Sequence, residues 1–254
     1  MILHETNWKD IENADIKVAI LPWGATEAHN YHLPYGTDTM LVEKVACDAA
    51  EIANKNMAGT IVLPSIAYGV NTGQIELKLC MNMNPSTQHA ILKDILYALD
   101  YHEINKFVIV NGHGGNNFRQ IIRELTLEYP DMIICSVDWW KICDEKDYFE
   151  DNGDHAGEME TSTMQVVHPE FVLPLDEAGD GCEHSFKIAG FKEKWAWTPR
   201  RWIFASDDTG IGNPKGSTPE KGERFLSDCT NKLADFLLDF SKIKSEDELY
   251  EVKN

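Results

Sequence analysis

The sequence has little positive charge. Of its 254 residues, 23 are Lys or Arg and 42 are Asp or Glu, which gives a formal net charge of −19. Phosphate backbones and anionic lipids carry the same sign, so we expect neither nucleic acid nor a membrane surface as a partner. The acidity has two interpretations: it aids solubility, or part of it belongs to a carboxylate-rich site that attracts cations.

Long hydrophobic runs and paired cysteines are also missing. No apolar run approaches the roughly 20 residues that span a bilayer, and residues 1–10 lack the basic and apolar stretches of a signal peptide. The six cysteines form no Cys-x-x-Cys pair, which favours idle thiols in a reducing compartment over a disulfide framework. We therefore expect a cytoplasmic protein.

Short apolar runs alternate with amphipathic stretches, and 43% of the residues are hydrophobic, enough for a sizeable core. The runs predict buried strands at residues 17–22, 60–64, 106–110 and 132–137. Helical spacing predicts helices over residues 39–56, from Pro85 onward, after residue 117 with Leu125 and Leu127 among its core residues, and over 219–242 with Phe236 facing inward.

This alternation predicts a single α/β domain over residues 1–254, with a mostly parallel sheet and helices on both faces. Residues from about 171 to 216 are rich in Gly, Pro and Trp and look like long surface loops. The polar tail from about residue 243 is expected to fray.

Three polar clusters follow predicted strands or begin a predicted helix. They contain Glu27, His29, His32 and Asp38; His113 between glycines; and His155, Glu158 and Glu160. Imidazole nitrogen and carboxylate oxygen are ligands for Zn²⁺ or Mn²⁺. Two divalent cations would balance three carboxylates and a hydroxide, whereas three close carboxylates without metal would repel one another and take up protons. The clusters therefore predict a metal site, with two ions favoured over one.

Some of these residues have a second interpretation. His32, beside Leu33 and Pro34, is interpreted as a hydrogen-bonded structural histidine. Glu158 and Glu160 are two residues apart and point to different sides of a helix, so one of them faces solvent, and spacing does not decide which. Cys182 offers an alternative thiol nucleophile, although no strand-to-helix turn supports it.

The tryptophans also have two interpretations each. Trp139 and Trp140 follow a strand end, where they line a site or pack in the core or an interface. Trp195, Trp197 and Trp202 lie in the irregular region, where they form a lid or, as we favour, a packing contact.

Taken together, the three clusters resemble the creatininase (creatinine amidohydrolase) family. Residues 21–38 follow its Leu-Pro-x-Gly-Ser-x-Glu-x-His-Gly-x-His-Leu-Pro-x-x-Thr-Asp signature, with Ala25 for the serine, Asn30 for the glycine and Tyr31 at the usual proline. Residues 111–116 and 155–162 match the second and third motifs, and residues 210–222 resemble a late glycine-rich segment. The resemblance covers about residues 15 to 240.

The resemblance implies a three-layer α/β/α sandwich with a dinuclear metal site that hydrolyses amide C–N bonds. Two divalent ions, Zn or alternatively Mn or Fe, would be held by Glu27, His29, Asp38, His113 and Glu160, with Asp38 bridging. The expected catalytic residues are His155 and Glu158. The expected pocket residues are Trp139, Trp140, Gly114, Gly115 and Asn116. The partner would be a small-molecule amide, and the family usually assembles as hexamers, so a homo-oligomer is expected.

One departure from the family pattern bears on the substrate. Creatininase has a glutamate two residues after the second-motif histidine, where Gly115 stands here. The resemblance makes Glu160 the candidate to replace it and argues against creatinine itself. Small cyclic amides, formamides and short peptides remain as candidate substrates. The alternative from another functional class is a catalytically silent, metal-binding member of the family.

Overall fold

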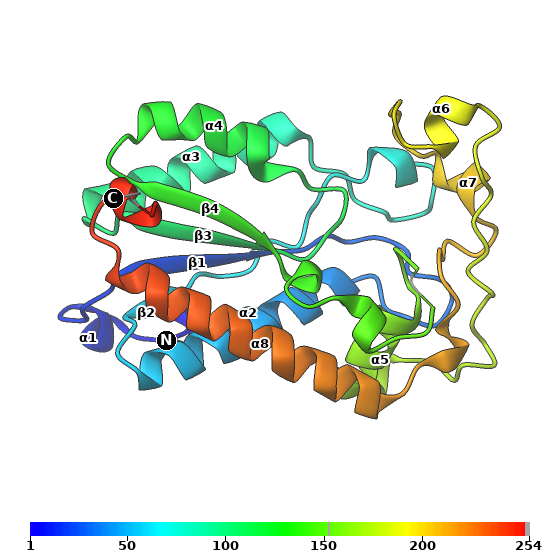
Figure 1. Cartoon of the computed structure of the whole chain (residues 1–254), viewed down its shortest axis with the longest axis horizontal. Helices are drawn as coiled ribbons and strands as arrows, with labels where there is room; N and C mark the ends of the chain where they lie inside the picture. Colours follow the sequence, from blue (N-terminus) through cyan, green and yellow to red (C-terminus); the bar gives the residue numbers. More distant parts are fainter. Residues whose placement is uncertain (152, 252–254) are drawn as a thin grey trace.

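The fold is built on a parallel sheet flanked by helices. The computed structural model describes residues 1–151 and 153–251. Its strands are β1 (Val18–Trp23), β2 (Thr60–Val62), β3 (Lys106–Asn111) and β4 (Ile133–Asp138). They pair in parallel in the order β2-β1-β3-β4 (Figure 1). The chain therefore moves from β1 outward to β2, then returns to the other side of β1 with β3.

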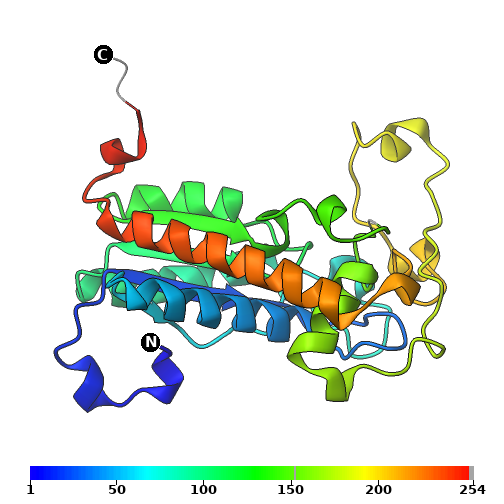
Figure 2. The same ribbon diagram turned by 60° about the horizontal axis from the view of Figure 1, so that its bottom comes forward.

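Helices cover both faces of this sheet, which confirms the expected three-layer arrangement (Figure 1). The helices α2 (Thr37–Lys55) and α8 (Pro219–Lys242) run side by side on one face (Figure 2). The other face carries α3 (Pro85–Tyr101) and α4 (Phe118–Glu128). The shorter elements are α1 (Trp8–Ile11), α5 (Glu158–Val167), α6 (Ala189–Lys192), α7 (Trp202–Ala205) and the 3-10 helices Leu3–Glu5, Thr72–Gln74, Trp139–Lys141, Glu145–Asp147, Pro169–Phe171, Pro214–Gly216 and Glu246–Leu249.

The position of β1 inside the sheet explains why its sequence is continuously apolar. Every residue of β1 is buried. Val18 and Ile20 belong to the core on the side of α2 and α8, whereas Ala19, Leu21 and Trp23 belong to the core on the side of α3 and α4. Alternate side chains of a strand point to opposite faces, so a strand covered on both faces needs apolar residues at every position.

The predicted helix cores are correct except at two positions. In α4, Leu125 is fully buried but Leu127 is 85% exposed. Residues two positions apart in a helix are rotated about the helix axis by roughly 200°, so Leu127 lies on the opposite side of α4 from Leu125. In α8, Phe236 is 38% exposed, since it precedes the buried Leu237 by one residue and is turned about 100° away from the core.

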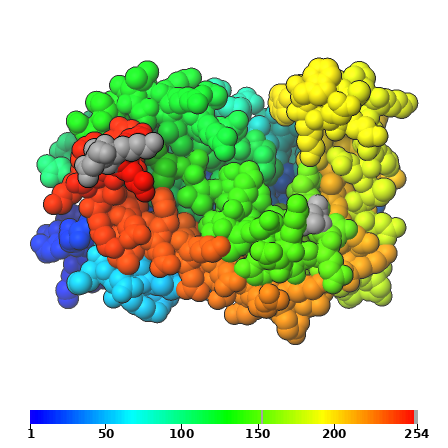
Figure 3. All heavy atoms as spheres, in the orientation of Figure 1, coloured from blue at the N-terminus to red at the C-terminus, as the bar shows by residue number. Residues whose placement is uncertain are grey.

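The irregular region beyond α5 forms an arm at the carboxyl end of the sheet. We use "the arm" for residues 184–205, whose base is closed by a hydrogen bond from the backbone N–H of His184 to the carbonyl of Ala205 (2.8 Å). The arm carries α6 and α7, and its far part stands away from the body of the molecule (yellow in Figure 3). Among the described residues, no helix is long and apolar enough to cross a membrane. All six cysteines lie in the described part of the chain and are free.

Candidate metal centre and active site

The predicted ligands meet at the carboxyl end of the sheet, between β1 and β3. Glu27 and His29 follow β1, and His113 follows β3. Asp38 lies in the first turn of α2, and Glu160 in the first turn of α5. In parallel α/β sheets, ligands bind at this edge, at the point where successive crossovers lead in opposite directions.

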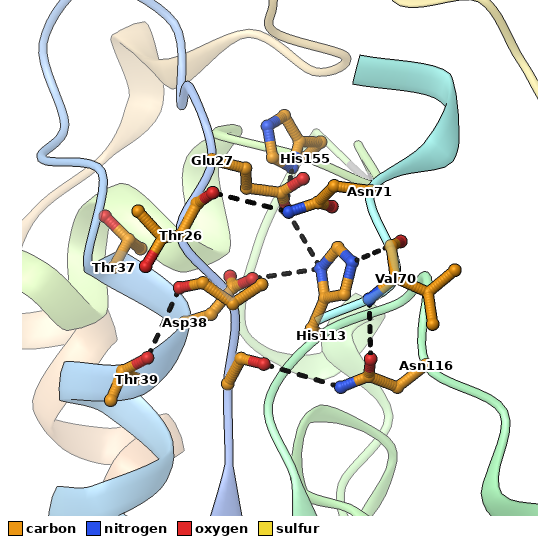
Figure 4. A network of polar contacts seen from close by, with 12 residues as sticks. Thr26, Glu27, Thr37, Asp38, Thr39, Val70, Asn71, His113, Asn116 and His155 are labelled. Carbon is orange, nitrogen blue, oxygen red and sulfur yellow. Dashed lines mark hydrogen bonds and ion pairs between the residues drawn. The ribbon is translucent and has the colours of Figure 1, made fainter. Parts of the chain in front are cut away.

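Two sets of donor atoms share Asp38. We name Glu27, Asp38 and His113 the first donor set, and His29, Asp38 and Glu160 the second; within each set the ligand atoms lie within 4.8 Å of one another. The Nδ1 atom of His113 is 3.0 Å from Oε1 of Glu27 and 3.0 Å from Oδ2 of Asp38. The Nε2 atom of His29 is 3.0 Å from the other Asp38 oxygen, Oδ1. Asp38 therefore presents one oxygen to each set, and Figure 4 shows its contact with His113 in the first set.

Backbone carbonyls orient the three histidine rings. Nε2 of His113 lies 3.1 Å from the carbonyl oxygen of Val70, and Nδ1 of His29 lies 3.1 Å from that of Glu27. Nε2 of His155 lies 2.8 Å from the carbonyl oxygen of Ala28. A carbonyl can only accept, so we assign the proton of each ring to this nitrogen. The other nitrogen of each ring then directs a lone pair toward the carboxylates.

This arrangement fits divalent cations. Lone pairs of nitrogen and of anionic oxygen repel one another at about 3 Å unless a proton or a cation lies between them. Oδ2 of Asp38 is buried and has no hydrogen-bond partner among the described residues, although His113 is close. Two carboxylates with one imidazole form a set of hard and borderline ligands suited to Zn²⁺ or Mn²⁺. A second contact that fixes each ring is typical of metal-binding histidines.

The ionisation of the ligands supports the same interpretation. Burial alone would lower the pKa of His29 and His113, but the carboxylates around them outweigh it and raise both pKa values well above the usual range. Burial likewise opposes the ionised form of Asp38, but His29 and His113 hold the pKa of this carboxyl well below its usual value. In the absence of metal, protons therefore take the places that cations would fill.

Metal binding is expected to compete with these protons. Because the pKa values of His29 and His113 are raised, both rings carry an extra proton at neutral pH, and a cation must displace it. The apparent affinity for Zn²⁺ should rise as the pH rises from about 6 to about 8, with protons released to the buffer. Calorimetric titrations in buffers of different ionisation enthalpy measure this release. An affinity independent of pH, with no proton release, would contradict the assignment.

The structure distinguishes the two glutamates that spacing left open. Glu160 belongs to the second donor set. Glu158 is buried elsewhere: its carboxylate accepts from the backbone N–H of Glu150 (2.9 Å) and of Asp151 (2.8 Å), and it pairs with Lys221. Burial raises the pKa of Glu158, but these partners outweigh it and lower the pKa overall. The expectation that Glu158 is catalytic does not fit this geometry, because its oxygens are engaged away from the donor sets.

Two further candidates also lie apart from the donor sets. His32 is buried, and its Nε2 is 2.8 Å from Oγ1 of Thr161, as expected of a structural histidine. Burial lowers the pKa of His32 to about 4, so the ring is neutral. Cys182 is exposed and does not line the pocket described below.

A pocket of about 670 Å³ opens over the donor sets. Trp139, Trp140, Gly114 and Gly115 line it, as the sequence predicts. Asn116 does not: its Oδ1 accepts from the backbone N–H of Val70 (3.1 Å), so Asn116 fixes the loop whose carbonyl orients His113 (Figure 4). The pocket residues that sequence analysis missed include Gln74, Glu145 and Arg200, while Trp197 and Trp202 had been expected in packing contacts.

Gln74 is a buried partner of the first donor set. Its Nε2 donates to Oε2 of Glu27, and its Oε1 accepts from the Cys80 thiol at 3.2 Å. The segment around Gln74 lies in a 3-10 helix between β2 and α3, and it carries no motif in the sequence. Only the three-dimensional contact shows that it orients a ligand.

Gly115 is enclosed by the first donor set. A Cβ atom at residue 115 would lie 2.3 Å from the carbonyl oxygen of Val70 and 2.4 Å from Nε2 of His113. No side chain fits at this position without moving both groups. Residue 115 supplies no carboxylate, and Glu160 contributes one to the second donor set with His29. The expectation that Glu160 substitutes for the family glutamate stays a prediction.

The substitution Gly115→Ala is expected to weaken metal binding at the first donor set. The added Cβ displaces His113 and its carbonyl partner, and loss of such a supporting contact typically costs about 10- to 100-fold in metal affinity. Gly114→Ala is the matched control, because a Cβ there meets nothing within 4 Å. Zn²⁺ titration of both variants gives the comparison. Wild-type affinity for both ions in Gly115→Ala would contradict the expected crowding.

The fold and the donor sets define a parallel α/β protein with a candidate metal centre at the carboxyl edge of its sheet. The chain belongs to the creatininase family, because the family model described as creatinine amidohydrolase matches residues 4–237. Members of this family are hydrolases that act on C–N bonds, and this protein is one of them.

Several characterised relatives are similar along most of the chain. A mycofactocin precursor peptide peptidase of Mycobacterium ulcerans (strain Agy99) is 28% identical over 232 residues, covering 85% of this chain and 84% of its own. A creatinine amidohydrolase of Pseudomonas putida is 25% identical over 256 residues, covering 91% and 94%.

Solved structures show the same fold. A Bacteroides fragilis NCTC 9343 protein, provisionally assigned as a creatinine amidohydrolase, is 44% identical with a TM-score of 0.92, covering 99% of this chain and 98% of its own. A manganese form of creatininase is 23% identical with a TM-score of 0.79, covering 95% and 99%. A mutant of creatininase has been solved in a Zn-Zn form.

Proposed function

We propose that this protein is a dinuclear metal-dependent amidohydrolase that cleaves the C–N bond of a small cyclic amide, a formamide or a short peptide with water. The observation that carries the proposal is the sharing of Asp38 by two donor sets, one oxygen to each. A carboxylate that offers its two oxygens to two ligand groups suits a pair of ions. We propose Zn as the metal, with Mn or Fe as alternatives.

The protein residues have separate parts in this proposal. Glu27, Asp38 and His113 would hold one cation, and His29, Asp38 and Glu160 the other. When bound, such cations supply Lewis acidity, which polarises a substrate carbonyl and acidifies a water molecule. The carbonyls behind His29 and His113 keep the ligand nitrogens pointed at the cations.

We assign the proton transfer to His155 in this proposal. Its Nε2 donates to the carbonyl of Ala28, and its Nδ1 lies 3.6 Å from Oε1 of Glu27. Nδ1 can accept a proton from the attacking water and deliver it to the nitrogen of the departing amine. The C–O bond forms, the C–N bond breaks, and the products are a carboxylic acid and an amine.

The pocket bears on the substrate. Its volume of about 670 Å³ lies in the usual range for small-molecule sites and also admits a short peptide. The glycine at residue 115 separates this chain from the creatininase pattern. Two relatives, 28% and 27% identical to this chain, act on a peptide by name. We therefore propose peptides, formamides and cyclic amides as candidate substrates and rank creatinine below them.

The deciding experiment combines metal content with a substrate screen. Protein purified without chelator is analysed for Zn, Mn and Fe, then loaded with each metal and assayed with cyclic amides, formamides and short peptides. We expect close to two ions per chain, hydrolysis in one substrate class, and loss of activity with a chelator. Absence of metal binding and of activity after Zn²⁺ or Mn²⁺ addition would overturn the proposal. Binding of two ions without hydrolysis would favour a silent metal-binding member.

The assembly follows the family in our proposal, and the location follows the sequence features described above. We propose a cytoplasmic homo-oligomer, with a hexamer as the expected form. Light scattering coupled to size-exclusion chromatography gives the mass of the assembly, which is compared with 28.8 kDa for one chain.

A further inference from the structure

The ring of His155 contacts two other rings. The ring centroids of His155 and His29 are 4.1 Å apart, and those of His155 and Trp202 are 4.6 Å apart. Trp202 is the first residue of α7, is 8% exposed and lines the pocket. Its contact with His155 therefore brings the base of the arm against the residue that we propose to move the proton.

His155 needs such a contact to keep its orientation. Its backbone is fixed by two hydrogen bonds with Ile211, from its N–H (3.0 Å) and to its carbonyl (2.8 Å). Among the residues that the structure describes, its side chain has one hydrogen bond, to the carbonyl of Ala28. One hydrogen bond leaves the ring free to tilt about that bond, whereas a packed neighbour restricts the tilt. Displacement of a reacting group by about 1 Å can reduce turnover a hundredfold.

Arg200 in turn fixes Trp202. The guanidinium carbon of Arg200 lies 4.9 Å from the centre of a Trp202 ring, a cation–π distance. Its Nη1 is 2.9 Å from Oδ2 of Asp154, the residue before His155, and 3.6 Å from Oε1 of Glu183. Arg200 therefore ties the arm to the segment that carries His155.

The backbone at Arg200 is also held. A Cβ atom built on Gly73 would lie 1.9 Å from the carbonyl oxygen of Arg200, so the two chain segments are in close contact. The neighbouring Arg201 forms an ion pair with Glu76 on the same opposing segment. The base of the arm is thus fixed from two sides, while its far part stands away from the body (Figure 3).

We infer that Trp202, held by Arg200, is a positioning residue that keeps the His155 ring in the orientation required for proton transfer. The inference rests on the proposed function for the role of His155. The contact itself is independent of that role, so it can be tested on the protein alone. Removal of the Trp202 ring should release the His155 ring without removing any metal ligand.

The first test uses NMR and needs no substrate. In long-range ¹H–¹⁵N spectra of the zinc-loaded protein, with His155 assigned by comparison with His155→Gln, we expect one fixed tautomer with the proton on Nε2. In Trp202→Ala the two ring nitrogens should shift toward averaged values, and in Trp202→Phe they should stay near wild type. Zinc content should be unchanged in both. Identical His155 signals in wild type and Trp202→Ala would overturn the inference.

The second test separates positioning from substrate binding. With the amide that the wild type cleaves fastest in the screen above, Trp202→Ala should lower kcat about 10- to 100-fold and change KM less than about threefold. Trp202→Phe should recover most of the loss. Arg200→Met should have a smaller effect, and the double variant should be no slower than Trp202→Ala, because Arg200 acts through Trp202.

Trp195→Ala is the matched control, since Trp195 lies on the same arm, is 75% exposed and does not line the pocket. It should leave the NMR signals and both kinetic constants unchanged. A rise in KM with constant kcat in Trp202→Ala would show that Trp202 is a wall for the substrate and would refute positioning. If no amide is cleaved but the His155 signals change, the positioning contact stands and the proposed function fails.

Discussion

Replacement of Asp38 by Asn is expected to abolish binding of both metal ions and to lower turnover by about three orders of magnitude or more. Oδ1 of Asp38 faces His29, and Oδ2 faces His113. An asparagine keeps the shape of the side chain but replaces one oxygen with an NH₂ group and removes the negative charge. One donor set then meets N–H groups where a cation would bind, and the remaining oxygen is a weaker ligand for the other.

Elemental analysis after dialysis and kcat/KM of the metal-saturated enzyme measure the two effects of Asp38→Asn. Asp48→Asn is the matched control, because Asp48 lies on the same helix α2 and pairs at the surface with Lys44 at 2.8 Å. The control should keep two ions and full activity. Retention of two tightly bound ions in Asp38→Asn would contradict the bridging assignment, even if activity were lost for another reason.

His155→Ala is expected to keep both ions and to lose about 10²- to 10⁴-fold in turnover, the usual contribution of a general acid–base group. His155 could also be considered as a ligand, since it lies near Glu27 and His29. However, its Nδ1 is 3.6 Å from the nearest Glu27 oxygen, compared with 3.0 Å for His113. We therefore expect it to carry protons and to contribute little to metal affinity.

The metal content of His155→Ala distinguishes a role as metal ligand from a role as proton carrier. Added imidazole should restore part of the lost rate. His168→Ala serves as the control, because His168 pairs with Glu170 at the surface at 3.0 Å, and it should behave as wild type. Loss of one ion in His155→Ala would make His155 a ligand. Unchanged turnover with both ions bound would point instead to a protein that binds metal without catalysing this reaction.

The fold was predictable because each element carries its own pattern. The strand predicted at residues 17–22 is shifted by one residue from β1, and the strand predicted at 106–110 ends one residue before β3 does. The helix predicted over 219–242 has the bounds of α8, since Thr218 caps its first turn and Pro219 follows at the first helical position. A strand that is buried on both faces of a parallel sheet is continuously apolar, so it can be recognised within a short segment of sequence.

The donor sets were predictable for a different reason. Their residues follow strand ends, and parallel strand ends meet at one edge of the sheet. Spacing alone could not choose between Glu158 and Glu160, because that choice depends on where Lys221 and two backbone N–H groups lie. The roles of Gln74 and Asn116 likewise depend on contacts between segments that are distant in the sequence. A single sequence carries no signal for such contacts.

The three histidine rings are all oriented by main-chain carbonyls, those of Glu27, Ala28 and Val70. A point mutation replaces a side chain but leaves a carbonyl in place, so the ring orientations are largely insulated from substitution at residues 28 and 70. They depend instead on the path of the chain through residues 24–29 and 69–71. Insertions or deletions in these two short loops are therefore expected to disturb the ring orientations more than side-chain exchanges at residues 28 and 70 do.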